Sequence, residues 1–317
     1  MSSPKPAGVF FGTSAFAVPS LRAFAEAADC RLVVTQPDRP SGRGQHSEPT
    51  AVKRAARLLG LPTLEPVRLR DALEPLRRSG AALFAVASYG KIVPQGVLDV
   101  PQLGALNVHP SLLPLYRGAT PLQSQIRDGV RRSGVTVILM DAGMDTGDIV
   151  LQEPSAIGEW ETYGELHDRF AQLGARLLAQ AVALAAAGKL VRTPQAGRAS
   201  EADIERTLTH PLTKADLQID WRWSAGQIAD CVRSLSPQPG ARAALDGESI
   251  KILEARPYPD ESADASAREP TPGSILGTKD EALLVATGSG AVAIGRLIPP
   301  NRKPMSGREY AVGLVRK

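Results

Sequence analysis

The sequence predicts an α/β protein, with a Rossmann-like, mostly parallel sheet in an N-terminal domain and a small β-barrel in a C-terminal domain. Two observations carry this prediction. From Gly8 to Gly188, buried strand patterns alternate with helical patterns, which is the order of βαβ units. Beyond Thr207, short alternating strands are separated by glycine turns, which is typical of a small barrel. The length of 317 residues allows both domains.

Strands and helices follow one another in a regular order through the first domain. Apolar runs predict buried strands within residues 8–14, 30–38, 81–90, 104–109 and 134–141. Helices are predicted at 19–28, 50–60 and 162–188. The longest of them carries an apolar stripe that consists of Leu166, Phe170, Leu173 and Leu177. Strands joined by helices in this way indicate a parallel sheet with both faces covered.

A polar stretch at 189–207 separates the two parts of the chain. It predicts a first domain at 1–198, a linker at 199–207 and a second domain at 208–317. The second domain begins with one amphipathic helix within 214–237. The pair Asp246-Gly247 then predicts a tight hairpin turn between two of the short strands.

Composition excludes several classes of protein. Hydrophobic residues make up 43% and charged residues 22%, which is ordinary for a globular chain. No apolar run approaches the ~18 residues of a membrane span, and the N-terminus lacks a signal-peptide layout, so a cytoplasmic location is expected. The only cysteines, Cys30 and Cys231, exclude a disulfide scaffold. Neither a metal-ligand spacing nor a dinucleotide fingerprint, a P-loop or a G-x-S-x-G motif occurs, so no metal or nucleotide cofactor is expected.

The segment "GALNVHP" places two polar side chains at the end of a predicted strand. Asn107 and His109 are two residues apart and therefore point to the same face of the sheet. The carboxyl ends of strands are where open α/β sheets bind ligands. A histidine can hold or pass a proton near neutral pH, and an amide N–H can stabilise a developing oxyanion. Together they suit the attack of an amine on a carbonyl.

A carboxylate that orients the imidazole of His109 is expected at the end of the next strand. That strand ends in "DAGMDTGD", where Gly143 and Gly147 bracket Asp145 in a tight loop. Asp145 is preferred, because it lies within the loop, whereas the competing Asp141 and Asp148 lie at the ends of elements. A structural histidine, a turn-forming aspartate and a loop-capping asparagine are the alternatives that the residues alone leave open.

The motif N-x-H-P-S-L-L-P, followed downstream by G-M-D-T-G-D, closely resembles the folate-dependent formyltransferase family. The resemblance implies that Asn107, His109 and Asp145 are catalytic. It further implies a folate-binding turn that consists of Ser111, Leu112, Leu113 and Pro114. The implied co-substrate is 10-formyltetrahydrofolate, with no metal. Its pterin would be bound by backbone groups of the loops at 87–91 and 141–144.

Within the family, the branch that acts on initiator tRNA is favoured. "TQPDRPSGRG" resembles the loop by which that branch enters the acceptor arm, with Arg43 as its key arginine. The C-terminal part resembles the OB-like domain of the branch, and OB folds are suited to nucleic acid. The net charge is +4, and a basic tail lies at 296–317. The tRNA-binding residues expected on this basis are Arg39, Arg43, Arg302 and Lys303. Gln45-His46 replace the usual lysines of the loop.

The resemblance therefore implies formyl transfer to the amino group of methionine on initiator tRNA. The sequence shows no coiled coil and no obvious dimer strip, so a monomer is expected. The methionine amine would attack the formyl carbon, while Asn107 and a protonated His109 stabilise the oxyanion and Asp145 assists proton transfer. Two other functions remain open. One is the same chemistry on a small amine, such as a nucleotide-sugar or a ribonucleotide. The other is a tRNA-binding module that has kept a folate pocket without catalysis.

Overall fold

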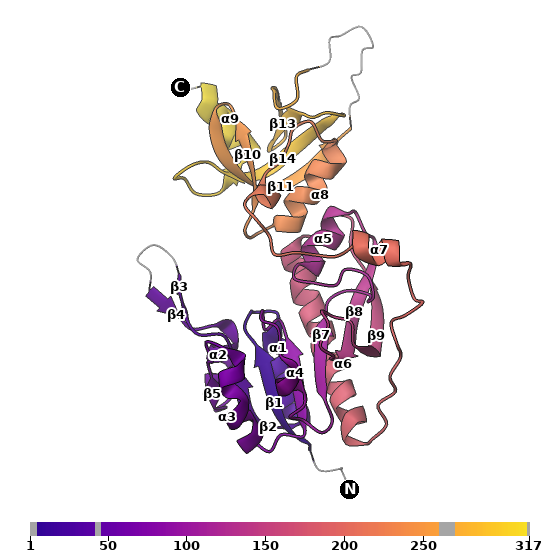
Figure 1. The fold of residues 1–317 in the computed structure, drawn as a ribbon. Helices are drawn as coiled ribbons and strands as arrows, with labels where there is room; N and C mark the ends of the chain where they lie inside the picture. The colour runs from indigo at the N-terminus through magenta and orange to yellow at the C-terminus, as the bar shows by residue number, and fades with distance from the viewer. Residues whose placement is uncertain (1–4, 42–45, 260–269, 316–317) are drawn as a thin grey trace. The chain divides into compact units, whose positions relative to one another are not determined.

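A computed structural model describes residues 5–41, 46–259 and 270–315 (Figure 1). Contacts divide the chain into two compact units. The first consists of Met1–Pro121, Arg132–Ala156 and His167–His210, and the second of Leu122–Arg131, Ile157–Leu166 and Pro211–Lys317. Two short segments that precede the predicted linker thus group with the C-terminal part. The domain boundaries at 198 and 208 stay a prediction.

Seven strands form the sheet of the first unit, in the order β5-β2-β1-β6-β7-β8-β9. Their bounds are β1 Ala7–Gly12, β2 Asp29–Val34, β5 Thr63–Leu64, β6 Leu83–Ala87, β7 Ala105–His109, β8 Arg132–Leu139 and β9 Asp148–Ala156. The pairs from β5 to β7 are all parallel. The alternation of apolar strands with helices therefore predicted β1, β2, β6 and β7 correctly, whereas the two-residue strand β5 was not predicted.

The last two strands of the sheet run in the opposite direction. Strand β8 is antiparallel to β7, with His109 opposite Thr136 and Leu106 opposite Leu139. Strand β9 is antiparallel to β8. The apolar run at 134–141 is a strand as predicted, but its place in a parallel βαβ unit was wrong. The chain leaves β7 at His109 and re-enters the sheet beside that same end, and an apolar run carries no information about direction.

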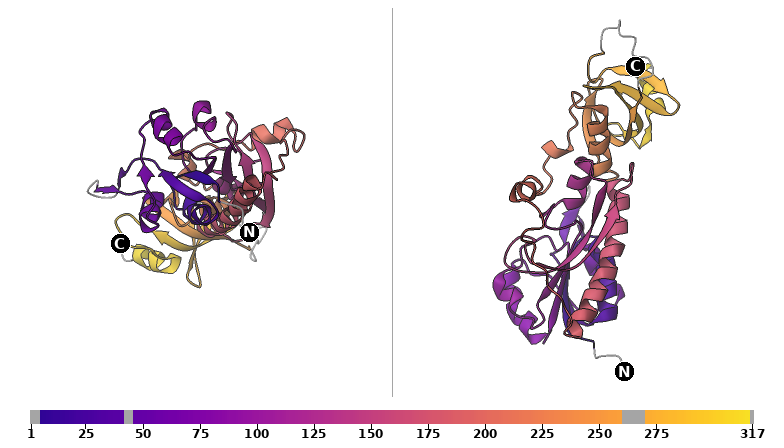
Figure 2. Two further views of the ribbon diagram at one scale, coloured as in Figure 1. Left: turned by 90° about the horizontal axis from the view of Figure 1, so that it is seen from below. Right: turned by 90° about the vertical axis from the view of Figure 1, so that its right-hand side faces the viewer.

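Helices cover both faces of this sheet (Figure 2). Phe10 and Phe11 are neighbours on β1 and so point to opposite faces. Phe10 contacts Phe24 of helix α1, with ring centroids 5.9 Å apart. Phe11 belongs instead to a buried cluster that includes Leu76 and Val97. The described helices of the first unit that precede α5 are α1 Ala17–Ala27, α2 Ala51–Leu58, η1 Leu69–Ala72, α3 Leu73–Arg78 and α4 Gln95–Leu98. Helix α5, Pro121–Arg127, belongs almost wholly to the second unit.

The long helix α6, Tyr163–Ala186, packs closely against the strand that carries the candidate site. A Cβ atom at Gly174 would lie 2.5 Å from Val108 Cγ1, so only glycine allows this approach. Val108 therefore faces α6. Because side chains alternate along a strand, Asn107 and His109 point away from α6, to the other face of β7.

The second unit is an antiparallel sheet packed on helix α8. Its strand order is β10-β11-β14-β13-β12, with β15 paired to β14. The predicted hairpin is confirmed, since Asp246 and Gly247 have φ of 49° and 74°, as a type I′ turn requires. Ile228 and Val232 of α8 lie in the core. The bounds are α8 Ala225–Leu235, β10 Ala241–Leu245, β11 Glu248–Tyr258, β12 Ile275–Lys279, β13 Ala282–Ala286, β14 Ala291–Ile298, β15 Met305–Ser306 and α9 Gly307–Val315, with a short η2 at Ala215–Leu217.

Three further findings concern membrane helices, disulfides and metal sites, which the composition had addressed. Among the described helices, none combines the length and the apolar character that crossing a membrane requires. Cys30 of β2 and Cys231 of α8 are both buried and free of a disulfide. The described residues hold no group of three or more His, Cys, Asp or Glu side chains placed to bind a metal ion.

Candidate active site

Strand β7 positions Asn107 and His109 at its carboxyl end. Both side chains are largely buried, with exposed fractions of 9% and 4%. The strand ends at His109 because Pro110 has no N–H to continue the ladder. The next residues form a tight turn, as the bond of 3.0 Å from Ser111 N to His109 O shows. The predicted placement of the two polar side chains on one face is therefore confirmed by the backbone.

Each ring nitrogen of His109 faces an oxygen atom of the protein. Nε2 lies 2.8 Å from the backbone oxygen of Tyr116. A carbonyl oxygen only accepts, so Nε2 carries the proton of that bond. Nδ1 faces the Asp145 carboxylate, 3.5 Å from Oδ2. The imidazole ring and the carboxylate therefore face each other in a largely buried setting.

Asp145 contacts both polar side chains of β7. Its Oδ1 accepts a bond from Asn107 Nδ2 at 3.4 Å. Its Oδ2 accepts a bond from the backbone N–H of Gly118 at 2.9 Å, in addition to facing His109. The three residues that the sequence singled out thus meet around one carboxylate. Asp145 has φ of 55°, in the left-handed region that non-glycine residues rarely adopt.

The loop between β8 and β9 decides which aspartate reaches the site. Asp141 accepts bonds from Gly143 N at 3.1 Å and Thr146 Oγ1 at 2.6 Å, so its carboxylate closes the loop on itself. Asp148 begins strand β9. The preference for Asp145 over these two neighbours agrees with this geometry. The loop must bend back to reach His109, because antiparallel β8 ends at the opposite end of β7.

The turn Ser111–Pro114 is fixed from within the protein. The peptide bond between Leu113 and Pro114 is cis. Ser111 is fully buried, and its Oγ donates to Leu115 O at 2.7 Å. Leu113 is also buried, in a small cluster with Ile138 and Ile149. The side chains of Ser111 and Leu113 therefore hold the shape of the turn.

Three polar side chains near the site were missed by the sequence reasoning. Thr136 Oγ1 donates to Ser111 O at 2.6 Å and accepts from Leu113 N at 3.3 Å. Gln152 Nε2 donates to Leu113 O at 3.0 Å. Gln195 lies in the polar stretch 189–207 but has an exposed fraction of only 5%. Aperiodic polar residues carry no signal of burial, and only the continuous apolar run of β8 around Thr136 could have indicated that this residue is buried.

The residues expected to bind tRNA are distributed over both units. Arg39 lies on β3, Arg39–Ser41, which pairs antiparallel with β4, His46–Glu48. Arg43 lies outside the described residues. Arg302 and Lys303 are exposed between β14 and β15.

Lys53 holds the chain where it enters the β3–β4 hairpin. Its Nζ donates to Asp38 Oδ2 at 2.6 Å and to Glu65 Oε2 at 2.8 Å. These hydrogen bonds, first the one to Asp38, raise the pKa of Lys53. The charged ammonium therefore ties helix α2 to the residue that precedes β3.

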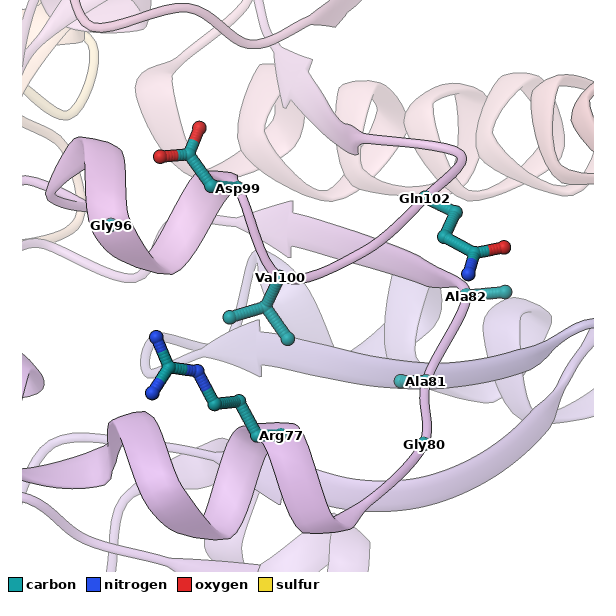
Figure 3. Close-up of a pocket in the computed structure, with 8 residues that line it drawn as sticks. All are labelled: Arg77, Gly80, Ala81, Ala82, Gly96, Asp99, Val100 and Gln102. Carbon is teal, nitrogen blue, oxygen red and sulfur yellow. The ribbon is translucent and has the colours of Figure 1, made fainter.

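A cavity of about 360 Å³ lies at the opposite end of the sheet from His109 (Figure 3). Its residues precede strands β6 and β7, whereas Asn107 and His109 lie toward the carboxyl end of β7. They are Arg77, Gly80, Ala81, Ala82, Gly96, Asp99, Val100 and Gln102. Arg77 is already paired with Glu74, at 3.3 Å. This cavity therefore adds nothing to the constellation around Asp145.

Comparison with known proteins finds a family model for each of the two parts of the chain. The model of the formyl transferase family matches residues 9–182. The model of the formyl transferase C-terminal domain matches residues 211–314. The chain belongs to the formyl transferase family.

Individual relatives narrow the resemblance to one branch. A protein of Pelotomaculum thermopropionicum named methionyl-tRNA formyltransferase is 40% identical over 96% of this chain and 95% of its own. One of Solibacter usitatus with the same name is 42% identical, over 96% and 94%. The N-formyltransferase of Helicobacter canadensis, solved with folinic acid and dTDP-3-aminofucose, is 17% identical with a TM-score of 0.64, over 91% and 98% of the two chains. The resemblance to methionyl-tRNA formyltransferases is confirmed.

Proposed function

We propose that this protein transfers the formyl group of 10-formyltetrahydrofolate to the amino group of methionyl-initiator tRNA. The observation that carries the proposal is the meeting of Asn107, His109 and Asp145 at the carboxyl end of β7. Relatives of nearly the same length are named for this reaction. The folinic acid in the Helicobacter canadensis structure supports a folate as the formyl donor. The proposed enzyme acts as a cytoplasmic monomer.

The reaction needs a hydrogen-bond donor for the formyl oxygen and a path for one proton. A bond forms between the amine nitrogen and the formyl carbon, and the bond from that carbon to the folate nitrogen breaks. The proton lost by the amine balances the proton gained by the folate nitrogen. Asn107 supplies the donor in this proposal, because one N–H of Nδ2 faces Asp145 and the amide has a second.

His109 and Asp145 have the proton-handling part in this proposal. The Nε2–H of His109 is engaged by Tyr116 O, which leaves Nδ1 toward Asp145. These two contacts support a role for His109 in proton transfer, in place of a direct hydrogen bond to the oxyanion. In this proposal the ring lies beside the reacting carbon, and His109 Nδ1 with the Asp145 carboxylate passes the proton lost by the amine to the departing nitrogen.

The folate is proposed to lie against the Ser111–Pro114 turn and the two loops at 87–91 and 141–144. Polar bonds join the first of these loops to its neighbours, since Thr13 Oγ1 and Gln36 Nε2 both donate to Tyr89 O, each at 2.8 Å. Two large exposed apolar side chains of the first unit, Ile92 and Met144, lie at the end of one loop and on the other. Exposed apolar side chains beside backbone hydrogen-bonding groups fit a flat, polar-edged ring.

For the tRNA, the proposal keeps Arg39, Arg43, Arg302 and Lys303 as contacts with phosphates. The exposure of Arg302 and Lys303 supports it, because phosphate contacts need free cationic side chains. Replacement of each by glutamine should weaken tRNA binding and reduce its dependence on salt.

Transfer of labelled formyl from 10-formyltetrahydrofolate tests the proposal directly. Charged initiator tRNA, charged elongator methionine tRNA and a nucleotide-linked amino sugar serve as acceptors in parallel. Labelled product with the initiator alone is expected. Transfer to the sugar alone, or no transfer by a protein that still binds the folate, would refute the proposal that methionyl-initiator tRNA is the acceptor.

The variant His109→Ala tests the assigned chemistry. Its turnover should fall by about 10²–10⁴ from the loss of the proton-handling group, with tRNA affinity nearly unchanged. Gel-shift titration with charged tRNA provides the comparison. Equal losses of turnover and of tRNA affinity would show that His109 acts on binding instead.

A further inference from the structure

Gln195 is a buried amide that joins the two loops of the candidate site. Its Nε2 donates to Asp145 O at 2.8 Å and to Gly147 O at 2.7 Å. Its Oε1 accepts from Arg117 Nη2 at 2.7 Å and from Arg117 Nε at 3.2 Å. Both donors and both lone pairs of the amide are thereby used. Only this orientation of the amide pairs every donor with an acceptor.

On one side, Gln195 holds the backbone that presents the catalytic carboxylate. Asp145 has the left-handed φ of 55°, a conformation that persists only where the surroundings enforce it. Gln195 bonds to the carbonyl of that residue and to the carbonyl two residues later. A rotation of the Asp145 peptide would break the first bond, so the amide restrains the conformation that directs the carboxylate to His109.

On the other side, Gln195 binds Arg117, which lies between two residues whose backbone atoms contact the site. Tyr116 supplies the carbonyl that accepts from His109, and Gly118 supplies the N–H that donates to Asp145. Arg117 lies between them, and its guanidinium is bonded to Gln195. One side chain therefore sets the distance between the segment that holds His109 and the loop that holds Asp145.

The segment that carries Gln195 is itself firmly attached. Two residues before it, Thr193 exchanges both backbone hydrogen bonds with Ile149, at 2.8 and 2.9 Å. Farther along, Thr209 N donates to Arg117 O at 2.8 Å. Gln195 thus reaches the site from a chain that is fixed to β9 on one side and to the Arg117 segment on the other.

We propose that Gln195 is a positioning residue for formyl transfer, acting through the Asp145 loop and Arg117 without touching substrate. The proposal rests on the function proposed above. Loss of the amide should misplace the Asp145 carboxylate relative to His109. Misplacement of a catalytic group by about 1 Å lowers turnover by about 10²-fold.

The test uses Gln195→Met, which keeps the length of the side chain and removes all four bonds. Gln180→Met is the matched control, because Gln180 is exposed on helix α6. Gln195→Glu is a third variant, which keeps an acceptor for Arg117 but turns a carboxylate toward the two carbonyls. Turnover of charged tRNA, folate affinity and the thermal midpoint are measured for each variant of the full chain.

A positioning role predicts a split between turnover and binding. Turnover by Gln195→Met and Gln195→Glu should fall by about 30- to 100-fold, while the folate dissociation constant changes by less than about threefold. The Gln180→Met control should match the wild type in both. Unchanged turnover in a folded Gln195→Met protein would overturn the proposal. An equal loss of folate affinity would do so too, since it would indicate general loosening.

Nuclear magnetic resonance of the His109 ring separates this proposal from the proposed function. The ring signals of His109 are assigned by comparison with His109→Ala and should shift in Gln195→Met but not in Gln180→Met. If the wild type transfers no formyl group, the proposed function fails, and the ring signals alone decide whether Gln195 positions the site. Unshifted signals overturn the positioning role whatever the activity.

Discussion

Thr136 gives the strongest test of how the Ser111–Pro114 turn is held. The residue is fully buried on β8. Its hydroxyl donates to Ser111 O and accepts from Leu113 N and from Gln152 Nε2. Thr136→Val replaces this hydroxyl by a methyl group of nearly the same size. The substitution therefore removes three hydrogen bonds without opening a cavity.

The loss of stability in Thr136→Val follows from the buried polar groups that are left without hydrogen-bond partners. Ser111 O and Leu113 N lose their bonds, and each unsatisfied buried group costs about 1–3 kcal/mol. Gln152 Nε2 keeps its second bond, to Leu113 O. Burial of the new methyl group returns about 0.8 kcal/mol. Thr136→Val should thus lower the free energy of unfolding by about 1–5 kcal/mol.

Urea unfolding and folate titration measure the two consequences. The control Thr136→Ser keeps the hydroxyl and should cost only about 1 kcal/mol, for one lost methyl group. In Thr136→Val, folate binding must also order the Ser111–Pro114 turn. A cost of about 1.4 kcal/mol for this ordering weakens folate binding about tenfold. Equal stability and equal folate affinity of the valine and serine variants would refute the reasoning.

Two further predictions concern the contact of Gly174 with Val108 and the two buried cysteines. Gly174→Ala puts a Cβ atom 2.5 Å from Val108 Cγ1, so circular dichroism melts should show a loss of about 1–3 kcal/mol. Gly226→Ala, with its nearest atom at 4.0 Å, should instead stabilise by up to about 1 kcal/mol. Burial raises the pKa of Cys30 to about 11 and also raises that of Cys231. Both thiols stay protonated at pH 8, so iodoacetamide should label them only in urea, and labelling of the folded protein would contradict this burial.

Local patterns predicted most elements of the fold. Strands β1, β2, β6 and β7, helices α1, α2 and α6, and the hairpin at Asp246-Gly247 each depend on a few neighbouring residues. The direction of β8 could not be predicted in this way. Its side chains alternate in the same manner whichever way the strand runs, and only pairing with β7 decides the direction.

In the candidate site, too, some features could be predicted from local patterns and others could not. Alternation along β7 was enough to place Asn107 and His109 on one face, because the two-residue period of a strand is local. Gln195 carried no comparable signal. Its burial depends on Arg117 and Asp145, which are 78 and 50 residues away in the sequence.

The sequence by itself determined the class of protein and the three residues of the proposed chemistry, since strand alternation and a specific motif require no distant partner. The tertiary structure decided that the antiparallel β8–β9 loop bends back until Asp145 meets His109. It also decided that Thr136 and Gln195 hold the turn and the loop in place. These side chains are fixed by hydrogen bonds between segments far apart in the chain, and such bonds leave no periodic trace in the sequence.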